Sequence, residues 1–217
     1  MNPASIFIVD DHPLVRRGLQ QLINGEPDLE VFGEAAGTRE TLAALSHTMP
    51  DLAIIDLSLH DGNGLELAKH LLARFPELLI LISSMHDENL FAERALKAGA
   101  KGYINKSATG DELINAIKLV LSGKIYVSQQ LLLNKISDDI HPEQSPVRQL
   151  SNRELEIFEY IGSGMGTADI ASKVNLSIKT IESHRANIKK KLGLASSGEL
   201  VRSAMLWSLE SNFPDPN

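Results

Sequence analysis

The sequence has no cysteine among its 217 residues. Disulfide bridges, thiolate zinc sites and cysteine nucleophiles are therefore excluded, and a reducing cytoplasm is the expected compartment. Long apolar runs are also missing: the run at 78–82 is far too short to span a bilayer, so we expect no membrane partner. The chain enters an apolar run at Ile6 without a cationic leader, and no signal peptide is expected.

Positive charge is scarce overall, since 21 Lys and Arg face 28 Asp and Glu, for a net charge of −7. The deficit lies in the first part of the chain. Residues 1–124 carry 11 basic against 17 acidic side chains, whereas the remainder carries 10 against 11. Within the remainder, residues 179–191 hold five basic side chains and one acidic one. This asymmetry indicates that the acidic first half receives a signal and that the second half, with its basic segment, contacts an anionic partner.

Residues 1–123 alternate between strand and helix patterns. Strands are expected at 6–9, 30–35, 52–56, 78–83 and 102–104. Helices are expected from Pro13, at 39–47, 65–75 and 89–98, and from a Thr109–Glu112 capping box to Gly123. The first helix carries Leu14, Leu19 and Leu22 at helical spacing. Five strands alternating with helices predict a doubly wound α/β domain with a five-stranded parallel sheet.

Polar and charged side chains follow four of these strands, and they are Asp10, Asp11, Asp56, Ser84 and Lys106. Parallel strands end at one edge of the sheet, where such folds bind ligands. A carboxylate that accepts a phosphoryl group needs charge neutralisation rather than a base, and Mg²⁺, an ammonium and a hydroxyl would supply it. Each residue alone has an ordinary explanation, such as Asp11 favouring a helix start. Their convergence favours a phosphoacceptor site at Asp56.

These residues, with Tyr103 three places before Lys106, make residues 1–123 resemble the receiver domain of two-component systems, a flavodoxin/CheY-like fold. The resemblance implies that a cognate sensor histidine kinase phosphorylates Asp56 with the help of Lys106 and Ser84. It implies a switch through Ser84 and Tyr103, although a half-buried strand aromatic is a competing interpretation of Tyr103. The implied Mg²⁺ ligands are Asp10, Asp11, Asp56 and the backbone carbonyl of Ser58.

Other functional classes fit less well. An aspartyl-phosphate hydrolase would need a second aspartate where Ser58 stands, and a flavodoxin would need a phosphate-accepting loop where Asp10-Asp11 repel anions. We therefore expect no enzyme beyond Mg²⁺-dependent self-phosphorylation and dephosphorylation at Asp56. His60 replaces the proline usual in receivers, and Ser84 replaces the commoner threonine. Because of His60, a DNA-binding regulator whose receiver no longer depends on phosphate remains an alternative.

Residues 124–148 are expected to form a linker with a short helix near 129–135, because 137–148 are polar, contain two prolines and lack periodicity. The region from 149 to 217 shows only helix patterns. A Ser151–Glu154 capping box opens the first helix, and Thr167 is expected to cap a short helix ending at Lys173. Ser177 is expected to cap a longer helix that Gly193 ends, and a last helix is expected at 199–209.

Two helices joined by a tight turn, the second one basic, are typical of a helix-turn-helix. Residues 149–217 resemble the four-helix LuxR-type DNA-binding domain, through runs at 150–154, 169–171, 179–184, 187–188 and 191–194. The whole chain resembles NarL/FixJ-class response regulators. Double-stranded DNA is the implied partner, and RNA polymerase is a further candidate. The expected DNA-contacting residues are Thr167, Lys179, Thr180, Glu182, Ser183, Arg185, Ala186, Asn187, Lys189 and Lys190.

The last helix is apolar at several positions. Family members commonly dimerise there, so the resemblance implies a homodimer, formed on phosphorylation, through Leu200, Val201, Ala204 and Met205. A helix that packs into its own domain's core is the alternative. In the same way, the lysine run at 189–191 can serve as a solvated helix end as well as a phosphate contact.

Overall fold

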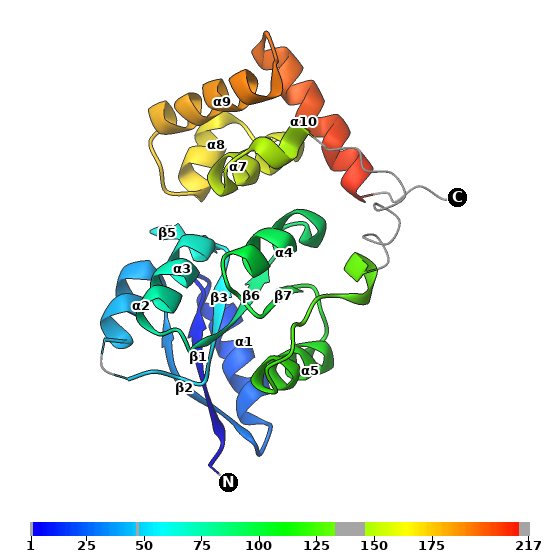
Figure 1. Ribbon diagram of the computed structural model, residues 1–217. Helices are drawn as coiled ribbons and strands as arrows, with labels where there is room; N and C mark the ends of the chain where they lie inside the picture. Colours follow the sequence, from blue (N-terminus) through cyan, green and yellow to red (C-terminus); the bar gives the residue numbers. More distant parts are fainter. Residues whose placement is uncertain (1, 47, 133–145, 213–217) are drawn as a thin grey trace. The chain divides into compact units, whose positions relative to one another are not determined.

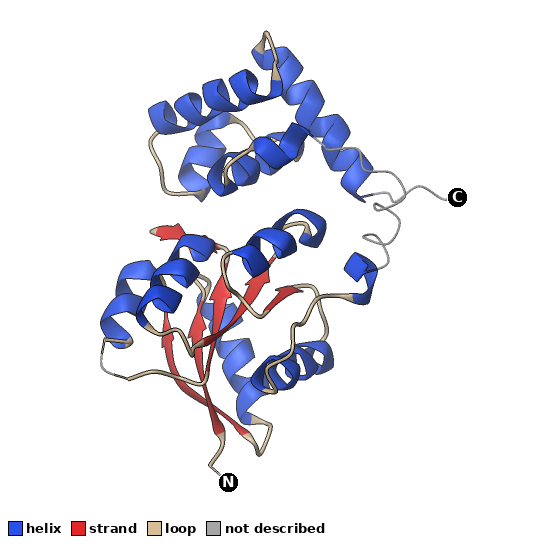
Figure 2. Cartoon of the chain, viewed as in Figure 1, coloured by secondary structure: helices blue, strands red, loops and turns tan. Residues whose placement is uncertain are grey.

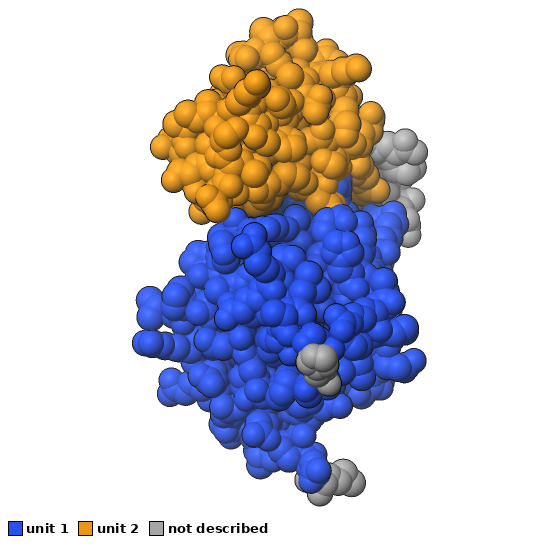
Figure 3. Space-filling view, turned by 90° about the vertical axis from the view of Figure 1, so that its left-hand side faces the viewer, with its two compact units in different colours: residues 1–140 blue, residues 141–217 orange. Residues whose placement is uncertain are grey.

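A computed structural model of the chain describes residues 2–46, 48–132 and 146–212. The chain forms two compact units, residues 1–140 and 141–217, which Figure 3 colours separately. The polar segment at 137–145 lies outside the described residues, as does the second half of the helix expected near 129–135, of which 129–132 are helical. The boundaries 1–123, 124–148 and 149–217 stay predictions.

Unit 1 is an α/β fold with one main sheet (Figures 1 and 2). Its main strands are β1 (Ala4–Val9), β2 (Leu29–Ala35), β3 (Leu52–Asp56), β6 (Leu79–Ser84) and β7 (Gly102–Asn105). Its helices are α1 (Pro13–Asn24), α2 (Thr38–Ala44), α3 (Gly64–Arg74), α4 (Glu88–Lys97) and α5 (Gly110–Leu121). The strand order is β2-β1-β3-β6-β7, and all neighbouring strands are parallel. The predicted five-stranded parallel sheet is confirmed.

Burial on both faces of this sheet explains its continuous apolar strands. Ile6, Ile8 and Ile54 face a core shared with α1 and α5, through side chains such as Ile23 and Ile117. The intervening strand residues are also buried, because β3 has no exposed position. The sheet therefore holds its strand ends in fixed positions, which is what a site at its edge requires.

The three leucines noted at helical spacing in the first helix differ in burial. Leu19 packs against the core, but Leu14 is 81% exposed and Leu22 is 45% exposed. The buried side chain of α1 is Ile23 instead. Helical spacing alone did not distinguish the inner face of α1 from its outer face.

A two-stranded hairpin that the sequence did not predict follows the acceptor strand. It consists of β4 (Ser58–Leu59) and β5 (Gly62–Asn63), which pair antiparallel. Asp61 in its turn accepts hydrogen bonds from the N–H groups of Thr38 (2.7 Å) and Arg39 (3.0 Å). These bonds fix the hairpin to the start of α2, which has no side-chain cap of its own. His60 therefore lies in an anchored turn.

Unit 2 is helical throughout its described residues. A short 3-10 turn, η1 (Pro146–Gln149), precedes α7 (Asn152–Gly162), α8 (Thr167–Lys173), α9 (Ile178–Leu192) and α10 (Ser197–Asn212). The capping box at Ser151 and the cap at Ser177 are confirmed, and Gly193 ends α9 at φ +69°. The predicted cap at Thr167 is wrong: Gly166 is the N-cap and Thr167 is already helical. Among the described helices, none has the length and apolar character needed to cross a membrane.

Candidate functional site

The edge of the main sheet at which Asp56 lies, called here the acceptor edge, is formed by segments far apart in the sequence. Because β1 pairs with β3 in parallel, with Val9 opposite Ile55, the aspartates after β1 meet Asp56 at the end of β3. β6 pairs on the other side of β3 and β7 pairs next to β6, so Ser84 and Lys106 reach the same edge. The structure thus brings the predicted acceptor residues together.

Lys106 is the charge partner at this edge. Its Nζ lies 2.6 Å from Oδ2 of Asp56 and 2.6 Å from Oδ2 of Asp10. Burial raises the pKa of Asp56 to about 6, and Asp10 adds to this, while the ammonium of Lys106 acts in the opposite direction. Burial also acts to lower the pKa of Lys106, but Asp56 and Asp10 together raise it above its usual value. Lys106 therefore stays charged, and two carboxylates share its single charge.

The carboxylates at this edge suit a hard cation. Ligand atoms of Asp10, Asp11, His12 and Asp56 all lie within 4.8 Å of one another. Carboxylate oxygens are the ligands that Mg²⁺ prefers, and Asp11 Oδ1 is buried and lies 2.7 Å from the ring Nδ1 of His12. The donor set therefore fits a divalent cation that would complete the neutralisation that Lys106 begins.

The predicted switch residues lie on the two strands that follow the acceptor strand in the sheet, Ser84 at the end of β6 and Tyr103 in β7. Ser84 and Tyr103 are both fully buried. The Tyr103 hydroxyl donates to the backbone carbonyl of His86 (2.9 Å), and the His86 N–H donates to Ser84 Oγ (3.1 Å). Tyr103 is therefore fully rather than half-buried, and its role as a switch stays a prediction. One residue, His86, connects the two switch side chains.

His86 is a residue that the sequence did not single out. Its Nε2 lies 2.7 Å from Oγ of Ser58, and its ring packs against Phe91 with centroids 5.1 Å apart. Ser58 also donates its N–H to Asp56 Oδ1, at 3.3 Å. The loop after β3 is thus tied both to the acceptor and to the loop after β6. Only the position of the histidine two places after Ser84 hints at this in the sequence.

Glycine at position 64 is required by the acceptor strand. A Cβ at this position would collide with the backbone carbonyl oxygen of Asp56. The N–H of Gly64 also donates to the carbonyl of Leu57, at 2.8 Å. The start of α3 therefore lies directly against the acceptor backbone and supports it.

In unit 2, the exposure pattern of α9 separates a packed face from an open one. Ile181 and Ile188 are fully buried, and Leu192 is half-buried. The open face carries Lys179, Glu182, Ser183, Ala186 and Lys190, which recur at helical spacing and are exposed. Arg185 and Lys189 are half-buried, Asn187 is exposed, and the half-buried Thr167 begins α8. An exposed basic face suits the major groove of DNA.

One ion pair joins α9 to α7, and a second lies within α7. Lys191 Nζ lies 2.6 Å from Glu154 Oε2, and Arg153 pairs with the buried Glu156 at 2.6 Å. Arg153 also donates to the backbone carbonyl of Val174, at 2.8 Å. Lys191 therefore has a structural partner, which separates it from the other two lysines of the run.

The dimer face expected on α10 stays a prediction, but its four residues differ in burial. Leu200 and Ala204 are fully buried within unit 2, where α10 packs on α7. A Cβ at Gly162 would reach the carbonyl of Ala204, which shows how close the two helices are. These two residues serve the domain's own core. Val201 is half-buried and Met205 is 42% exposed, so only these two of the four reach the surface.

Known protein families match both units. The family model for the response regulator receiver domain matches residues 6–118, and that for bacterial regulatory proteins of the luxR family matches residues 148–204. The chain is a response regulator of the luxR family. The oxygen regulatory protein NreC of Staphylococcus epidermidis is 39% identical over 209 residues, which cover 92% of this chain and 96% of that protein.

Solved structures of the response regulator RcsB from Salmonella are similar over nearly the whole chain. One shows RcsB of Salmonella enterica serovar Typhimurium bound to promoter P1flhDC in the presence of the phosphomimetic BeF₃⁻. It is 27% identical, has a TM-score of 0.65, and covers 94% of this chain and 98% of RcsB. Another shows two RcsB dimers on two parallel DNAs, with 26% identity, a TM-score of 0.58, and 96% and 100% coverage.

Proposed function

We propose that phosphorylation of Asp56 by a sensor histidine kinase controls dimerisation and promoter binding by this response regulator. The observation that carries the proposal is the position of Asp56. Its carboxylate ends a buried strand, lies 2.6 Å from Lys106 Nζ, and shares a cluster with Asp10 and Asp11. A buried carboxylate beside a cation and two acidic neighbours has little structural purpose, because burial of like charges is costly.

The transfer would use Asp56 as nucleophile. A carboxylate oxygen of Asp56 attacks phosphorus, the bond from phosphorus to the donor breaks, and the donor leaves with its electron pair. Lys106 is close enough to neutralise charge on the phosphoryl oxygens. Mg²⁺ would be held by Asp10, Asp11, Asp56 and the backbone carbonyl of Ser58, and when bound it would supply the remaining positive charge. No other catalysis is proposed.

The signal would leave the site through Ser84. In the structure its hydroxyl oxygen accepts from the His86 N–H, and its own hydrogen can be donated to a phosphoryl oxygen. Drawing Ser84 toward the phosphoryl group would pull on His86, whose carbonyl holds the Tyr103 hydroxyl. One hydrogen bond is worth about 1 kcal/mol, whereas reversing a 1:99 equilibrium takes roughly 5.5 kcal/mol. Lys106, Mg²⁺ and dimer formation would therefore share the work.

The output would be DNA binding by the open face of α9. Lys179, Glu182, Ser183 and Ala186 would face bases, with Glu182 accepting from a cytosine amino group. The proposed phosphate contacts are Lys179, Arg185, Asn187, Lys189 and Lys190, with Thr167 and Thr180 at the helix starts. Pairing on DNA would use Val201 and Met205 of α10. A sensor kinase and promoter DNA as partners, with RNA polymerase as a third, imply action in the cytoplasm.

Acetyl phosphate with Mg²⁺ tests the proposal, with the mass and the oligomeric state followed for the wild type and for Asp56→Asn. We expect an adduct of one phosphoryl group and a dimer in the wild type alone. If Asp56→Asn dimerises and binds promoter DNA like the wild type, the switch is wrong. The chain would then be a regulator that does not depend on phosphate.

A further inference from the structure

His12 places a ring nitrogen among the carboxylates of the acceptor edge. Its Nδ1 lies 2.7 Å from Oδ1 of Asp11 and 3.2 Å from Oδ1 of Asp10. A ligand atom of His12 and one each of Asp10, Asp11 and Asp56 all lie within 4.8 Å of one another. The acceptor edge therefore offers one nitrogen ligand beside three carboxylates.

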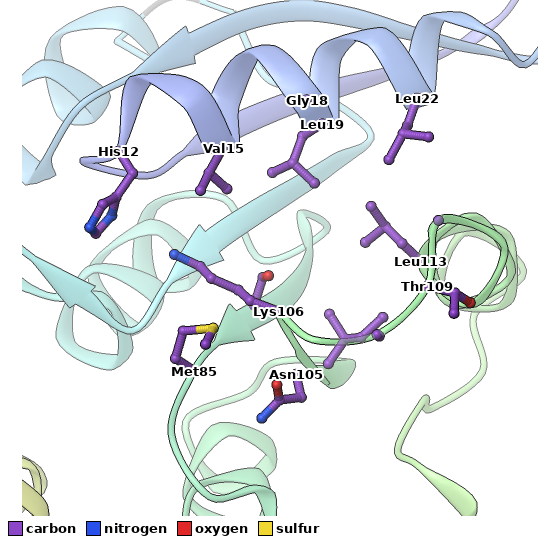
Figure 4. A pocket seen from close by; sticks show the side chains of 14 residues that line it. His12, Val15, Gly18, Leu19, Leu22, Met85, Asn105, Lys106, Thr109 and Leu113 are labelled. Carbon is purple, nitrogen blue, oxygen red and sulfur yellow. The ribbon is translucent and has the colours of Figure 1, made fainter. Parts of the chain in front are cut away.

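The backbone directs the ring to this position. The His12 N–H donates to Oδ1 of Asp10, at 2.8 Å, and Pro13 begins α1 directly after it. Because a proline restricts the residue before it, His12 is held in an extended conformation, at φ −92° and ψ 110°. Figure 4 shows the ring at the end of a pocket, on the side toward which the amino group of Lys106 points.

An oxygen of Asp11 is left without a hydrogen bond beside the ring. Asp11 Oδ1 is buried and accepts no hydrogen bond from the residues that the structure describes, although His12 Nδ1 is only 2.7 Å away. A buried carboxylate oxygen without a partner is unfavourable. A cation between the two atoms would give each of them a ligand bond.

The charge at the acceptor edge fits a divalent cation. Three carboxylates share the single charge of Lys106, so two negative charges remain when all three are ionised. Arg16, which is close to Asp10, is paired with Glu34. The His12 side chain is 65% exposed, so an ion can reach it from solvent. Mg²⁺ prefers oxygen ligands, whereas imidazole suits cations such as Fe²⁺ and Ni²⁺.

We propose that His12 is a metal ligand through Nδ1, and that the acceptor site binds a first-row transition cation of the Fe²⁺ or Ni²⁺ type in preference to Mg²⁺. Asp10, Asp11 and Asp56 supply the oxygen ligands, and the hydrogen of the neutral ring lies on Nε2. The inference adds a ligand and a class of metal to the proposed function. It rests on the cation site of that function but does not require phosphoryl transfer.

The alternative role for His12 is to hold the two neighbouring carboxylates in place. In that case its loss would weaken the binding of every cation to a similar extent, because Mg²⁺ and Ni²⁺ would use the same carboxylates. A direct nitrogen ligand affects mainly the cation that binds nitrogen. The ratio of the two affinities therefore distinguishes a ligand from a positioning residue.

Calorimetric titration of the full chain with Ni²⁺ and with Mg²⁺, without an added histidine tag, tests the proposal. We expect His12→Asn to lower the Ni²⁺ affinity at least roughly tenfold and to change the Mg²⁺ affinity by less than about threefold. His70→Asn, at an exposed position on α3, is the matched control and should change neither affinity. Equal losses for both cations in His12→Asn, or no loss for either, would overturn the proposal.

Magnetic resonance of the histidine rings, labelled with a heavy nitrogen isotope, detects the bond itself. The signal that is missing from His12→Asn identifies His12 in the wild type. Because Ni²⁺ is paramagnetic, we expect this signal to be the first to broaden as Ni²⁺ is added. If Mg²⁺ binds and the His12 signal does not respond to Ni²⁺, this inference alone is wrong. If neither cation binds the wild type, the cation site of the proposed function is wrong as well.

Discussion

Ser58 Oγ and His86 Nε2 lie 2.7 Å apart and join two loops that are 28 residues apart in the sequence. Ser58 follows the acceptor strand, and His86 follows the strand that carries Ser84. The His86 carbonyl also accepts from the Tyr103 hydroxyl. The loop that follows Asp56 is therefore connected to the residue that holds the buried tyrosine.

Ser58→Ala removes this link. We expect the free energy of unfolding to fall by about 0.5–1.5 kcal/mol, because a partly buried hydrogen bond to the imidazole is lost. Urea denaturation of the wild type and the variant measures the change. Ser107→Ala, which removes a hydroxyl bonded locally to Asn105 at an exposed position, is the control and should cost less. Equal losses in the two variants would show that the link contributes nothing of its own.

The raised pKa of Asp56 predicts how cation binding depends on pH. With a pKa of about 6 in the metal-free protein, Asp56 binds a proton below this pH. A cation must displace this proton, so Mg²⁺ affinity should fall by roughly tenfold per pH unit below about pH 6 and level off above about pH 7. Calorimetric titration with Mg²⁺ measures it. A flat affinity from about pH 5 to pH 8 would contradict the burial argument.

The raised pKa of Asp56 also makes the free energy of unfolding depend on pH. The dependence is opposite in sign to that of a salt-bridged carboxylate, whose pKa is lowered. The folded-state pKa lies above the unfolded value of 3.8, so the folded protein holds this proton more tightly. The stabilisation from Asp56 is complete below about pH 4 and is lost as the pH rises through about 6. Asn cannot ionise, so Asp56→Asn should not show this loss when metal is absent. The unfolding free energy of Asp56→Asn minus that of the wild type should therefore increase as the pH rises from about 4 to 7.

Gly64→Ala should damage the acceptor strand. The new Cβ would collide with the Asp56 carbonyl, so backbone must move, at an expected cost of about 2–3 kcal/mol in unfolding free energy. The acetyl phosphate adduct should also decrease. Gly18→Ala, at an open position within α1, is the control and should stabilise the unit by about 0.5–1 kcal/mol. A Gly64→Ala protein with unchanged stability and adduct would contradict the close approach.

Lys190→Ala and Lys191→Ala should have different effects although the residues are neighbours. Lys191→Ala breaks the contact with the buried Glu154 and should cost unit 2 about 1–2 kcal/mol, a modest loss because the lysine is partly exposed. Lys190→Ala should leave stability unchanged but weaken DNA binding and reduce the slope of log affinity against log salt by about 1. Thermal melts and DNA titrations at several salt concentrations separate the two. If the two variants had the same melting temperature and the same salt dependence of DNA binding, the separate roles of Lys190 and Lys191 would be wrong.

The sequence predicted features that rest on local or repeated patterns. The aspartates and Lys106 were found because each follows an apolar strand, and the caps at Thr109, Ser151 and Ser177 because short-range hydrogen bonds leave short-range signatures. These patterns report chemistry within a few residues. The main sheet followed from the alternation of such elements.

What escaped prediction depends on contacts between distant segments. The hairpin β4–β5 has two residues per strand, too few for periodicity to appear. The bond from Ser58 to His86 joins residues 28 positions apart, and only the place of the histidine two residues after Ser84 hints at it. Helix α10 is apolar on more than one side, so spacing could not tell the buried Leu200 from the exposed Met205.

The strand order has a consequence for how the protein is made. The acceptor aspartate lies on a central strand, but its lysine partner follows β7, at the edge of the sheet and late in the domain. A nascent chain therefore displays Asp10 and Asp56 long before Lys106 leaves the ribosome. Until then the aspartates have no fixed countercharge. If Asp56 accepts a phosphoryl group as proposed, a newly synthesised molecule would become competent only after the whole first unit has emerged and folded.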